Sequence, residues 1–200
     1  MSQVFDNEGN VIPATLVVAG PLVVTRIKTE EPLDKTRGKK DGYDAVQVGF
    51  CEKKLKNIKK PQKKLGAYRY IREFRFPAEE ISSFNPGDKI DVSIFKEGDK
   101  VEVTGITKSK GFQGVVKRHG FHGGPRTHGQ KHSEREPGSI GATAPQRVFK
   151  GTRMAGRMGG KQVKVKNLKI IKVDKDNNEL WISGALPGRR GTLLEIKSNE

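Results

Sequence analysis

The feature of this sequence that most restricts its fold is the uneven distribution of charge. Residues 105–170 contain 15 basic and 2 acidic side chains, a net charge of +13, whereas residues 1–104 carry +3 and residues 171–200 are neutral. Only 12 of the 54 residues from 107 to 160 are hydrophobic, and all four histidines lie there. Such a segment cannot bury enough apolar surface to offset the entropy lost on ordering. We therefore expect residues 107–160 to be irregular and to be held in place by a polyanion.

Both flanks of this segment have sequences typical of short β-strands. β-Branched and aromatic residues alternate with polar ones in several runs that turn residues separate. The expected strands cover residues 11–18, 22–28, 45–50, 68–76, 89–95, 100–106, 162–173, 180–186 and 193–197. Residues 96–99, Lys-Glu-Gly-Asp, favour a hairpin between two of these strands, and short helices are expected only at about residues 51–57 and 77–84.

This pattern predicts a mainly β fold. Eight or nine short strands between turns are typical of an antiparallel, closed or partly closed β-barrel with few short helices. We expect residues 1–106 and 161–200 to form a globular β-barrel domain, from which residues 107–160 extend as a long, Gly-rich basic loop. A second, smaller basic patch lies in the barrel part, because residues 53–64 contain seven lysines and Pro61.

Composition argues against several classes of protein. The longest nearly apolar run, residues 14–24, is interrupted by Thr15, Gly20 and Pro21, and it is shorter than the roughly 20 residues of a membrane-spanning helix. Cys51 is the single cysteine, so we expect neither an internal disulfide nor a cysteine-based zinc site. The first ten residues are polar, unlike a secretory signal. We therefore expect a cytoplasmic location and no membrane partner.

The first motif of the basic segment joins it to the barrel. Residues 105–118 read Gly-Ile-Thr-Lys-Ser-Lys-Gly-Phe-Gln-Gly-Val-Val-Lys-Arg. Gly111 and Gly114 let backbone amides approach a phosphate closely. The candidate RNA-binding cations are Lys108, Lys110, Lys117 and Arg118. The spacing is not that of a nucleotide-binding P-loop, and a flexible, solvated hairpin is the alternative that these residues leave open.

Histidines dominate the second motif, residues 119–141. The candidate RNA-binding residues here are His119, His122, Arg126, His128, Lys131, His132 and Arg135. Histidine and arginine planes can hydrogen-bond to and stack on unpaired RNA bases. A zinc site is the alternative, but histidine spacings of three, six and four on a Gly-rich backbone preorganise no ligand geometry, and the nearby cations oppose a dication. Phe112, Phe121 and Phe149 can either stack on bases or anchor the loop in protein.

The third motif, residues 147–161, has cations at intervals of three or four between glycines. These candidates are Arg147, Lys150, Arg153, Arg157 and Lys161. The glycines disfavour a stable helix. A chain of this kind can pass between closely spaced phosphates.

The sequence offers little for catalysis. Glu134 and Glu136 are the two carboxylates within residues 105–170, and we expect them to neutralise nearby arginines rather than act as acid and base. Cys51 is far in sequence from every histidine, and no serine lies in a nucleophile elbow. We therefore predict no enzymatic activity, catalytic residue, cofactor, metal ion or small-molecule substrate.

Together these motifs resemble the family of large-subunit ribosomal protein number three, in its bacterial or organellar form. The family pattern Gly-x-Ser/Thr-x-Gly-Lys-Gly-Phe-x-Gly-x-x-x-Arg is met at Gly105, Thr107, Lys110, Gly111, Phe112, Gly114 and Arg118, with Ser109 in place of one glycine. Matching residues at 127–129, 132–133, 135, 137–141, 148–151, 154–156 and 158–159 follow in family order. The likeness extends over nearly the whole chain, although its start matches only the tail of the usual opening. Residues 141–147 are one residue shorter than in the bacterial pattern, so a glutamine methylation is not assigned to Gln146.

The resemblance implies a structural rRNA-binding protein of the large ribosomal subunit. Its barrel would lie on the outer part of the subunit, and its loop would reach through ribosomal RNA towards the peptidyl-transferase region. The resemblance also implies binding near the 3′ end of that RNA, a role in early assembly, and contacts with the neighbouring proteins numbered fourteen and nineteen. Either a cytoplasmic or an organellar ribosome is compatible with the sequence.

Two other functions are open on the residues alone. A non-specific nucleic-acid-binding protein or RNA chaperone shares the charge but does not need the ordered loop motifs. A barrel enzyme acting on nucleotides or RNA needs a clustered acid and base or a set of metal ligands, and the sequence contains no evident cluster of either kind.

Overall fold

The structure is a computed structural model that describes residues 1–6, 8–30 and 41–198. It divides into two compact units, each assembled from segments that are distant in sequence. The first unit consists of Met1–Val101, Asn167–Ala185 and the chain end from Ser198, and the second of Glu102–Lys166 and Leu186–Lys197. Among the described residues, no helix is long and apolar enough to cross a membrane.

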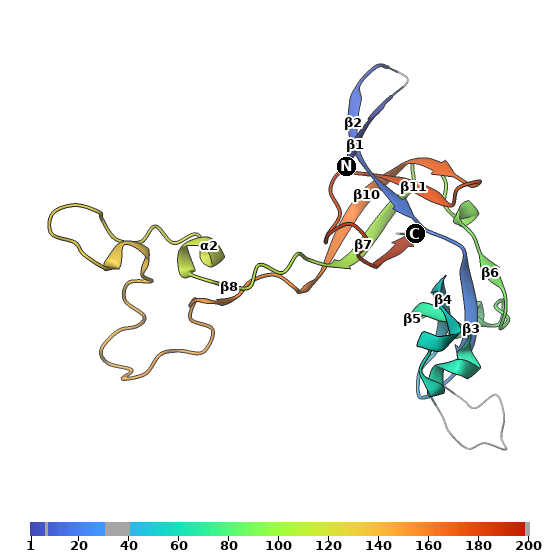
Figure 1. Cartoon of the computed structure of the whole chain (residues 1–200), viewed down its shortest axis with the longest axis horizontal. Helices are drawn as coiled ribbons and strands as arrows, with labels where there is room; N and C mark the ends of the chain where they lie inside the picture. The colour runs from blue at the N-terminus through green and yellow to red at the C-terminus, as the bar shows by residue number, and fades with distance from the viewer. Residues whose placement is uncertain (7, 31–40, 199–200) are drawn as a thin grey trace. The chain divides into compact units, whose positions relative to one another are not determined.

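Strands form most of the regular structure, and the pairs with a defined register are antiparallel. One sheet has the order β1 (Ser2–Phe5), β2 (Val11–Val18), β11 (Glu179–Ser183), β10 (Gln162–Asp174), β7 (Lys100–Ile106), β12 (Leu194–Ser198). A second has the order β5 (Tyr68–Phe74), β4 (Ala45–Glu52), β3 (Leu22–Lys28), β6 (Lys89–Ile90), and β8 (Phe112–Gln113) pairs with β9 (Gly156–Arg157) (Figure 1). The prediction of a mainly β, antiparallel fold is confirmed.

The helices are few and short, as predicted. They are α1 (Ala78–Ile81), α2 (Val115–His119) and the 3₁₀ helices η1 (Leu55–Asn57), η2 (Lys60–Leu65), η3 (Val92–Ile94) and η4 (Ser133–Arg135). The helix expected over residues 51–57 is wrong in its first half. Cys51 and Glu52 complete β4, because the Lys53 amide donates to the Ala67 carbonyl at 2.7 Å and holds this stretch next to the following strand.

The four-stranded sheet of the first unit has a small apolar core. Val24, Val46, Val48 and Ile81 are each at most 4% exposed. In register, Val24 lies opposite Val48, so these side chains share one face of the pleated sheet. The residues packed around them are Leu22, Ile27, Phe74, Phe76, Phe84 and Ile90.

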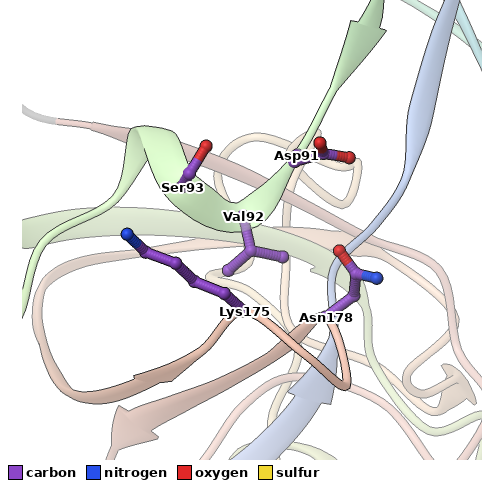
Figure 2. A pocket seen from close by; sticks show the side chains of 5 residues that line it. All are labelled: Asp91, Val92, Ser93, Lys175 and Asn178. Carbon is purple, nitrogen blue, oxygen red and sulfur yellow. The ribbon is translucent and has the colours of Figure 1, made fainter.

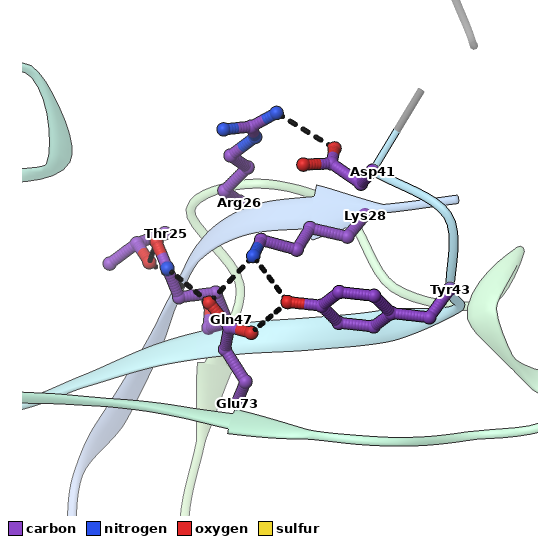
Figure 3. A network of polar contacts seen from close by, with 7 residues as sticks. All are labelled: Thr25, Arg26, Lys28, Asp41, Tyr43, Gln47 and Glu73. Atoms are coloured by element: carbon purple, nitrogen blue, oxygen red, sulfur yellow. Dashed lines mark hydrogen bonds and ion pairs between the residues drawn. The ribbon is translucent and has the colours of Figure 1, made fainter. Parts of the chain in front are cut away.

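The other face of this sheet carries a polar network (Figure 3), which Lys28 joins because the register shifts between Val24 and Arg26 and which Tyr43 joins from just before β4. The Lys28 ammonium donates to the Tyr43 hydroxyl at 2.7 Å and lies 2.9 Å from a Glu73 carboxylate oxygen. Tyr43 donates to the other Glu73 oxygen at 2.7 Å, and the Gln47 amide donates to the carboxylate at 2.9 Å. Because one carboxylate receives three donors, it holds β3, β4 and β5 in a single register.

This network shifts the pKa values of its two ionised members in the directions that stabilise both charges. The hydrogen bond with Tyr43, and then that with Glu73, raises the pKa of Lys28 above its usual value. Partial burial alone would raise the pKa of Glu73, but the hydrogen bonds from Lys28, Tyr43 and Gln47 together outweigh it and lower that pKa. Both groups therefore stay charged over a wider pH range than they would in an unfolded chain.

The strand expected over residues 89–95 is wrong beyond Ile90. Lys89 and Ile90 pair with β3, after which the chain turns as η3 and buries Val92. The predicted turn at residues 96–99 is present, since the Asp99 carboxylate accepts the Lys96 amide at 2.8 Å. It does not join a hairpin, however, because β6 belongs to the four-stranded sheet and β7 to the six-stranded one.

In the second unit, Gly105 on β7 allows a close approach that fixes the base of the basic segment. A Cβ at this position would lie 2.7 Å from a Leu194 methyl and 2.9 Å from the Pro187 ring. Any larger residue would therefore push these groups away. The first glycine of the first predicted motif consequently has a packing role.

Candidate nucleic-acid interface

The basic segment begins as a narrow two-stranded ribbon. The Thr107 amide donates to the Lys161 carbonyl at 3.0 Å. The Lys110 amide donates to the Met158 carbonyl, and the Met158 amide donates to the Gly111 carbonyl, at 2.9 Å each. The short β8–β9 pair continues the ribbon outward, and Figure 1 shows the outgoing and returning chains running together. This pairing brings the two ends of the predicted loop, with Lys108, Lys110, Arg157 and Lys161, into one element.

A glycine is required at one close approach of the two chains of the ribbon. Gly159 has a φ of +74°, and a Cβ there would overlap the Lys108 carbonyl oxygen. Both the left-handed backbone and the close approach exclude larger residues. The glycines of the third motif therefore shape the ribbon in addition to keeping the backbone free of helix.

Beyond the ribbon, α2 is tied to the returning chain by two of the predicted residues. Arg118 Nη1 donates to the Met154 carbonyl at 2.7 Å, and His119 Nε2 lies 3.0 Å from the same oxygen. A Cβ at Gly156 would collide with the Arg118 guanidinium. Arg118 and His119 are accordingly half-buried, so part of their hydrogen-bonding capacity holds the loop together.

Two further predicted residues, together with His119, line a hollow of about 480 Å³ in the second unit. Its wall includes His119, His122 and Arg153, with Phe121 beside His119 at a ring-centroid distance of 5.9 Å. The other lining residues are Gly120, Gly123, Gly124, Ser133, Glu136, Pro137 and Gly138. The Gly124 amide donates to the Ser133 carbonyl at 3.2 Å, which brings the second motif back on itself.

Most of the predicted residues are exposed. Of the sixteen, fourteen are exposed and only Arg118 and His119 are half-buried. The exposed ones are Lys108, Lys110, Lys117, His122, Arg126, His128, Lys131, His132, Arg135, Arg147, Lys150, Arg153, Arg157 and Lys161. Val115 is the one buried apolar residue within 107–160, a range that the structure describes in full. The segment thus consists largely of surface.

The carboxylates do little to neutralise this surface. Glu134 accepts the Arg126 guanidinium at 2.7 Å, as predicted for a local charge partner. Both side chains are exposed, so the pair adds little stability. Glu136 lines the hollow described above.

The aromatic residues divide into two groups. Phe112 and Phe149 are 76% and 56% exposed, and the Arg147 guanidinium lies 5.7 Å from the Phe149 ring centre. Neither ring anchors the loop in a protein core, so both are available for stacking. Phe121 is half-buried beside His119 and has the character of an anchor.

The first unit contains a smaller hollow of about 270 Å³, lined by Asp91, Val92, Ser93, Lys175 and Asn178 (Figure 2). In this view Val92 lies between the side chains of Lys175 and Asn178. None of the sixteen predicted residues lines it. Within the described residues there is also no group of three His, Cys, Asp or Glu side chains that could hold a metal ion.

Sequence reasoning missed the internal roles of several of these residues. Two-residue strands such as β8 and β9 have no detectable periodicity. The Met154 carbonyl that holds α2 is a backbone group, so the type of side chain at this position does not reveal it. The paired glycines at 159 and 160 are the one feature of the sequence that indicates a close approach of two chains.

Comparison with known proteins identifies the family of this chain. The family model of ribosomal protein L3 matches residues 49–195. The large ribosomal subunit protein uL3 of Corynebacterium aurimucosum is 45% identical over 99% of this chain and 89% of its own length. The proteins of the same name from Carboxydothermus hydrogenoformans and Finegoldia magna are 46% and 44% identical over 98% of this chain and 92% of theirs. The chain therefore belongs to the ribosomal protein L3 family.

Proposed function

We propose that this protein is a structural rRNA-binding protein of the large ribosomal subunit and that residues 107–160 extend among segments of that RNA. The observation that carries this proposal is the +13 charge of residues 105–170 together with fourteen exposed candidate residues and, within 107–160, a single buried apolar residue. A surface of this kind is self-repelling in the free protein. A polyanion removes the repulsion and replaces the missing core as the partner that orders the segment.

Family membership supports the ribosomal and non-enzymatic parts of the proposal. The relatives are bacterial and are named large ribosomal subunit proteins, and the family is one of structural ribosomal proteins rather than enzymes. We accordingly assign the chain to the cytoplasmic ribosome of a bacterial type, in translation and in assembly of the subunit.

The mechanism follows from the chemistry of the extension. Each Lys or Arg that contacts a phosphate releases condensed counterions, which favours binding. Irregular, Gly-rich backbone is thin and leaves amides unpaired, so it can approach phosphates where a helix would be too wide. Phe112, Phe149 and the exposed histidines add flat surfaces for unpaired bases.

The finer assignments rest on the resemblance of the motifs. We propose that the extension supports the peptidyl-transferase region, that binding occurs near the 3′ end of the RNA early in assembly, and that the proteins numbered fourteen and nineteen are neighbours. We also propose that the globular part is a closed or partly closed barrel formed by residues 1–106 and 161–200. Its support is the set of antiparallel sheets made by short, turn-separated strands.

Binding to large-subunit rRNA tests the proposal. An extension variant, R147Q/K150Q/R153Q/R157Q, should lose far more affinity than K172Q/K175Q/R189Q/R190Q, which removes the same charge from a neutral region. For the unchanged protein, the logarithm of the association constant should fall by roughly 0.7 to 0.9 for each tenfold increase in salt concentration and each neutralised phosphate. Footprinting should reveal one protected locus. Equal losses in the two variants, or protection spread evenly along the RNA, would favour a non-specific binding protein or RNA chaperone.

A further inference from the structure

We propose that the first unit carries a second RNA-binding surface, formed by residues 51–72 and independent of the extension. The ligand is the phosphate backbone of structured RNA, with at least one unpaired base next to it. This inference rests on the proposed function only in taking RNA as the partner. The sixteen candidate residues of the extension are not part of it.

The charge of the first unit is concentrated in this segment. Residues 51–72 contain nine basic and one acidic side chain, a net charge of +8. The other residues between 1 and 104 contain ten basic and fifteen acidic side chains, a net charge of −5. The nearly neutral total therefore conceals a dense cationic region within an acidic one. Such a separation of charge provides a local field for a polyanion.

The protein does not use these cations for its own ion pairs. The seven lysines are Lys53, Lys54, Lys56, Lys59, Lys60, Lys63 and Lys64. Among the described residues, no ion pair or side-chain hydrogen bond involves any of them, and all but Lys53 are exposed. In the same unit Arg26 and Lys28 do have carboxylate partners, at 2.8 and 2.9 Å. The unit pairs some of its cations internally and leaves this group unpaired.

The lysines stand on an ordered backbone rather than on a free loop. Two 3₁₀ helices, η1 and η2, carry most of them, and Pro61 lies in the first turn of η2. The Lys53 amide donates to the Ala67 carbonyl at 2.7 Å, which closes the segment at its base. In Figure 1 these turns lie beside β4 and β5. Because this backbone is already ordered, binding RNA would cost the protein little conformational entropy for arranging the cations.

Tyr68 fixes this segment to the sheet. Its ring covers Gly49 and Gly66, where an added Cβ would overlap the ring or approach within 2.5 Å of it. Gly66 also has a φ of +101°, which disfavours any other residue. Two glycines and one aromatic ring thus determine where the lysine-bearing turns leave and rejoin the sheet.

A flat aromatic surface follows directly. Phe50 and Tyr70 lie opposite each other on β4 and β5 and stack at 6.5 Å with an interplanar angle of 23°. The Arg69 guanidinium lies 5.2 Å from the Tyr70 ring centre. Cations beside stacked aromatic and arginine planes are the arrangement that binds phosphates and unpaired bases together. This feature favours RNA over an acidic protein, for which the stacked rings have no specific use.

The test uses the full chain and large-subunit rRNA. The patch variant is K56Q/K59Q/K60Q/K63Q, and its control, K96Q/K100Q/K172Q/K175Q, removes four exposed lysines elsewhere in the first unit. We expect the affinity of the patch variant to be about tenfold or more lower. The slope of log association constant against log salt concentration should become shallower by roughly 0.7 to 0.9 for each lost phosphate contact. The control should lose much less. Footprinting should show loss of a protected site different from the one lost in the extension variant.

The outcomes separate this inference from the proposed function. If the patch variant binds like its control while the extension variant fails, the second surface does not exist and the proposed function stands. If the unchanged protein binds RNA without salt dependence, the proposed function itself fails. Thermal unfolding should show that the patch variant is at least as stable as the unchanged protein, because neutralising adjacent lysines removes repulsion. An unchanged RNA footprint together with loss of binding to an acidic ribosomal protein would overturn the assignment to RNA.

Discussion

The four-stranded sheet of the first unit and the extension of the second treat charged residues in opposite ways. In the sheet, Lys28 and Glu73 lie 2.9 Å apart within a network that also contains Tyr43 and Gln47. In the extension, the ion pair between Arg126 and Glu134 is exposed and the other cations are exposed too, except for the half-buried Arg118. Lys28 and Glu73 of the sheet neutralise each other, whereas most cations of the extension have no carboxylate partner. Charge without a partner inside the protein, rather than charge alone, therefore marks the surfaces that we propose bind RNA.

The strongest test of this contrast is removal of the extension. Replacing residues 112–158 with a short Gly-Ser linker deletes β8 and β9 but should leave the four-stranded and six-stranded sheets folded, since it removes only Val115 from the buried residues and loop-closure entropy depends weakly on length. RNA affinity should fall by about 100-fold or more. Circular dichroism and RNA titration measure the two effects.

Hydrogen exchange on the intact free protein supplies the control for this deletion. Amides of residues 120–155 should exchange quickly, and those of β4 and β7 slowly, because only the latter lie in ladders within a sheet. Unfolding of the shortened chain, or strong protection of residues 120–155, would mean that the extension belongs to the folded core.

Core truncation should separate the two regions next. Ile81→Ala, at a site only 4% exposed, should cost about 2 to 5 kcal/mol of unfolding free energy. Ile140→Ala, at a site 44% exposed in the extension, should change it by less than about 0.5 kcal/mol. Urea denaturation measures both. Similar losses at the two positions would show that the extension has a core of its own.

A glycine pair tests whether the ribbon is a defined element. Gly159→Ala and Gly151→Ala both place alanine at a positive φ, a strain of about 1 to 2 kcal/mol. Only at Gly159 would the new Cβ also strike the opposite chain, at the Lys108 carbonyl, because nothing lies within 4 Å of Gly151. Hydrogen exchange at the Lys110 and Met158 amides should accelerate for Gly159→Ala alone. The same acceleration in both variants would argue against the close approach.

The smallest expected effect concerns acid stability. The pKa of Glu73 is lowered in the folded state, so the ionised carboxylate adds to the free energy of unfolding. This stabilisation is fully present above the unfolded pKa of about 4.3 and is lost as the pH falls through the lower pKa of the folded state. Glu73→Gln should therefore lower stability near neutral pH and flatten its decline in acid. Urea midpoints measured from neutral pH to about pH 3 would reveal this change. Glu79→Gln, an exposed residue of α1, should leave the profile unaltered.

Sequence patterns located the long strands because their alternation is a local property. The bounds of β2, β3 and β7 match the expected runs, and β10 ends one residue later. Residues 89–95 also alternate, but burial of Val92 in a 3₁₀ turn satisfies the same pattern without a strand. β1, β8 and β9 were missed because two to four residues contain too few periods to detect.

The candidate interface was found from composition, and its internal supports were not. Charge, glycine and histidine content identified residues 107–160 without any knowledge of their neighbours. The half-buried state of Arg118 and His119 depends on the Met154 carbonyl, which lies 36 and 35 residues away along the chain. The spacing of neighbouring residues in the sequence cannot predict a contact between residues so far apart.

The ribbon from Thr107 to Lys161 also has a topological consequence. Because the outgoing and returning chains are bonded to each other at its base, the extension has no free end. A loop without a free end enters an opening tip first, as two chains at once, so an opening wide enough for one extended chain does not admit it. On the proposed function, the RNA gap that receives this loop therefore has to be as wide as the tip while the loop enters, and RNA that fits more tightly around the narrow ribbon has to close afterwards.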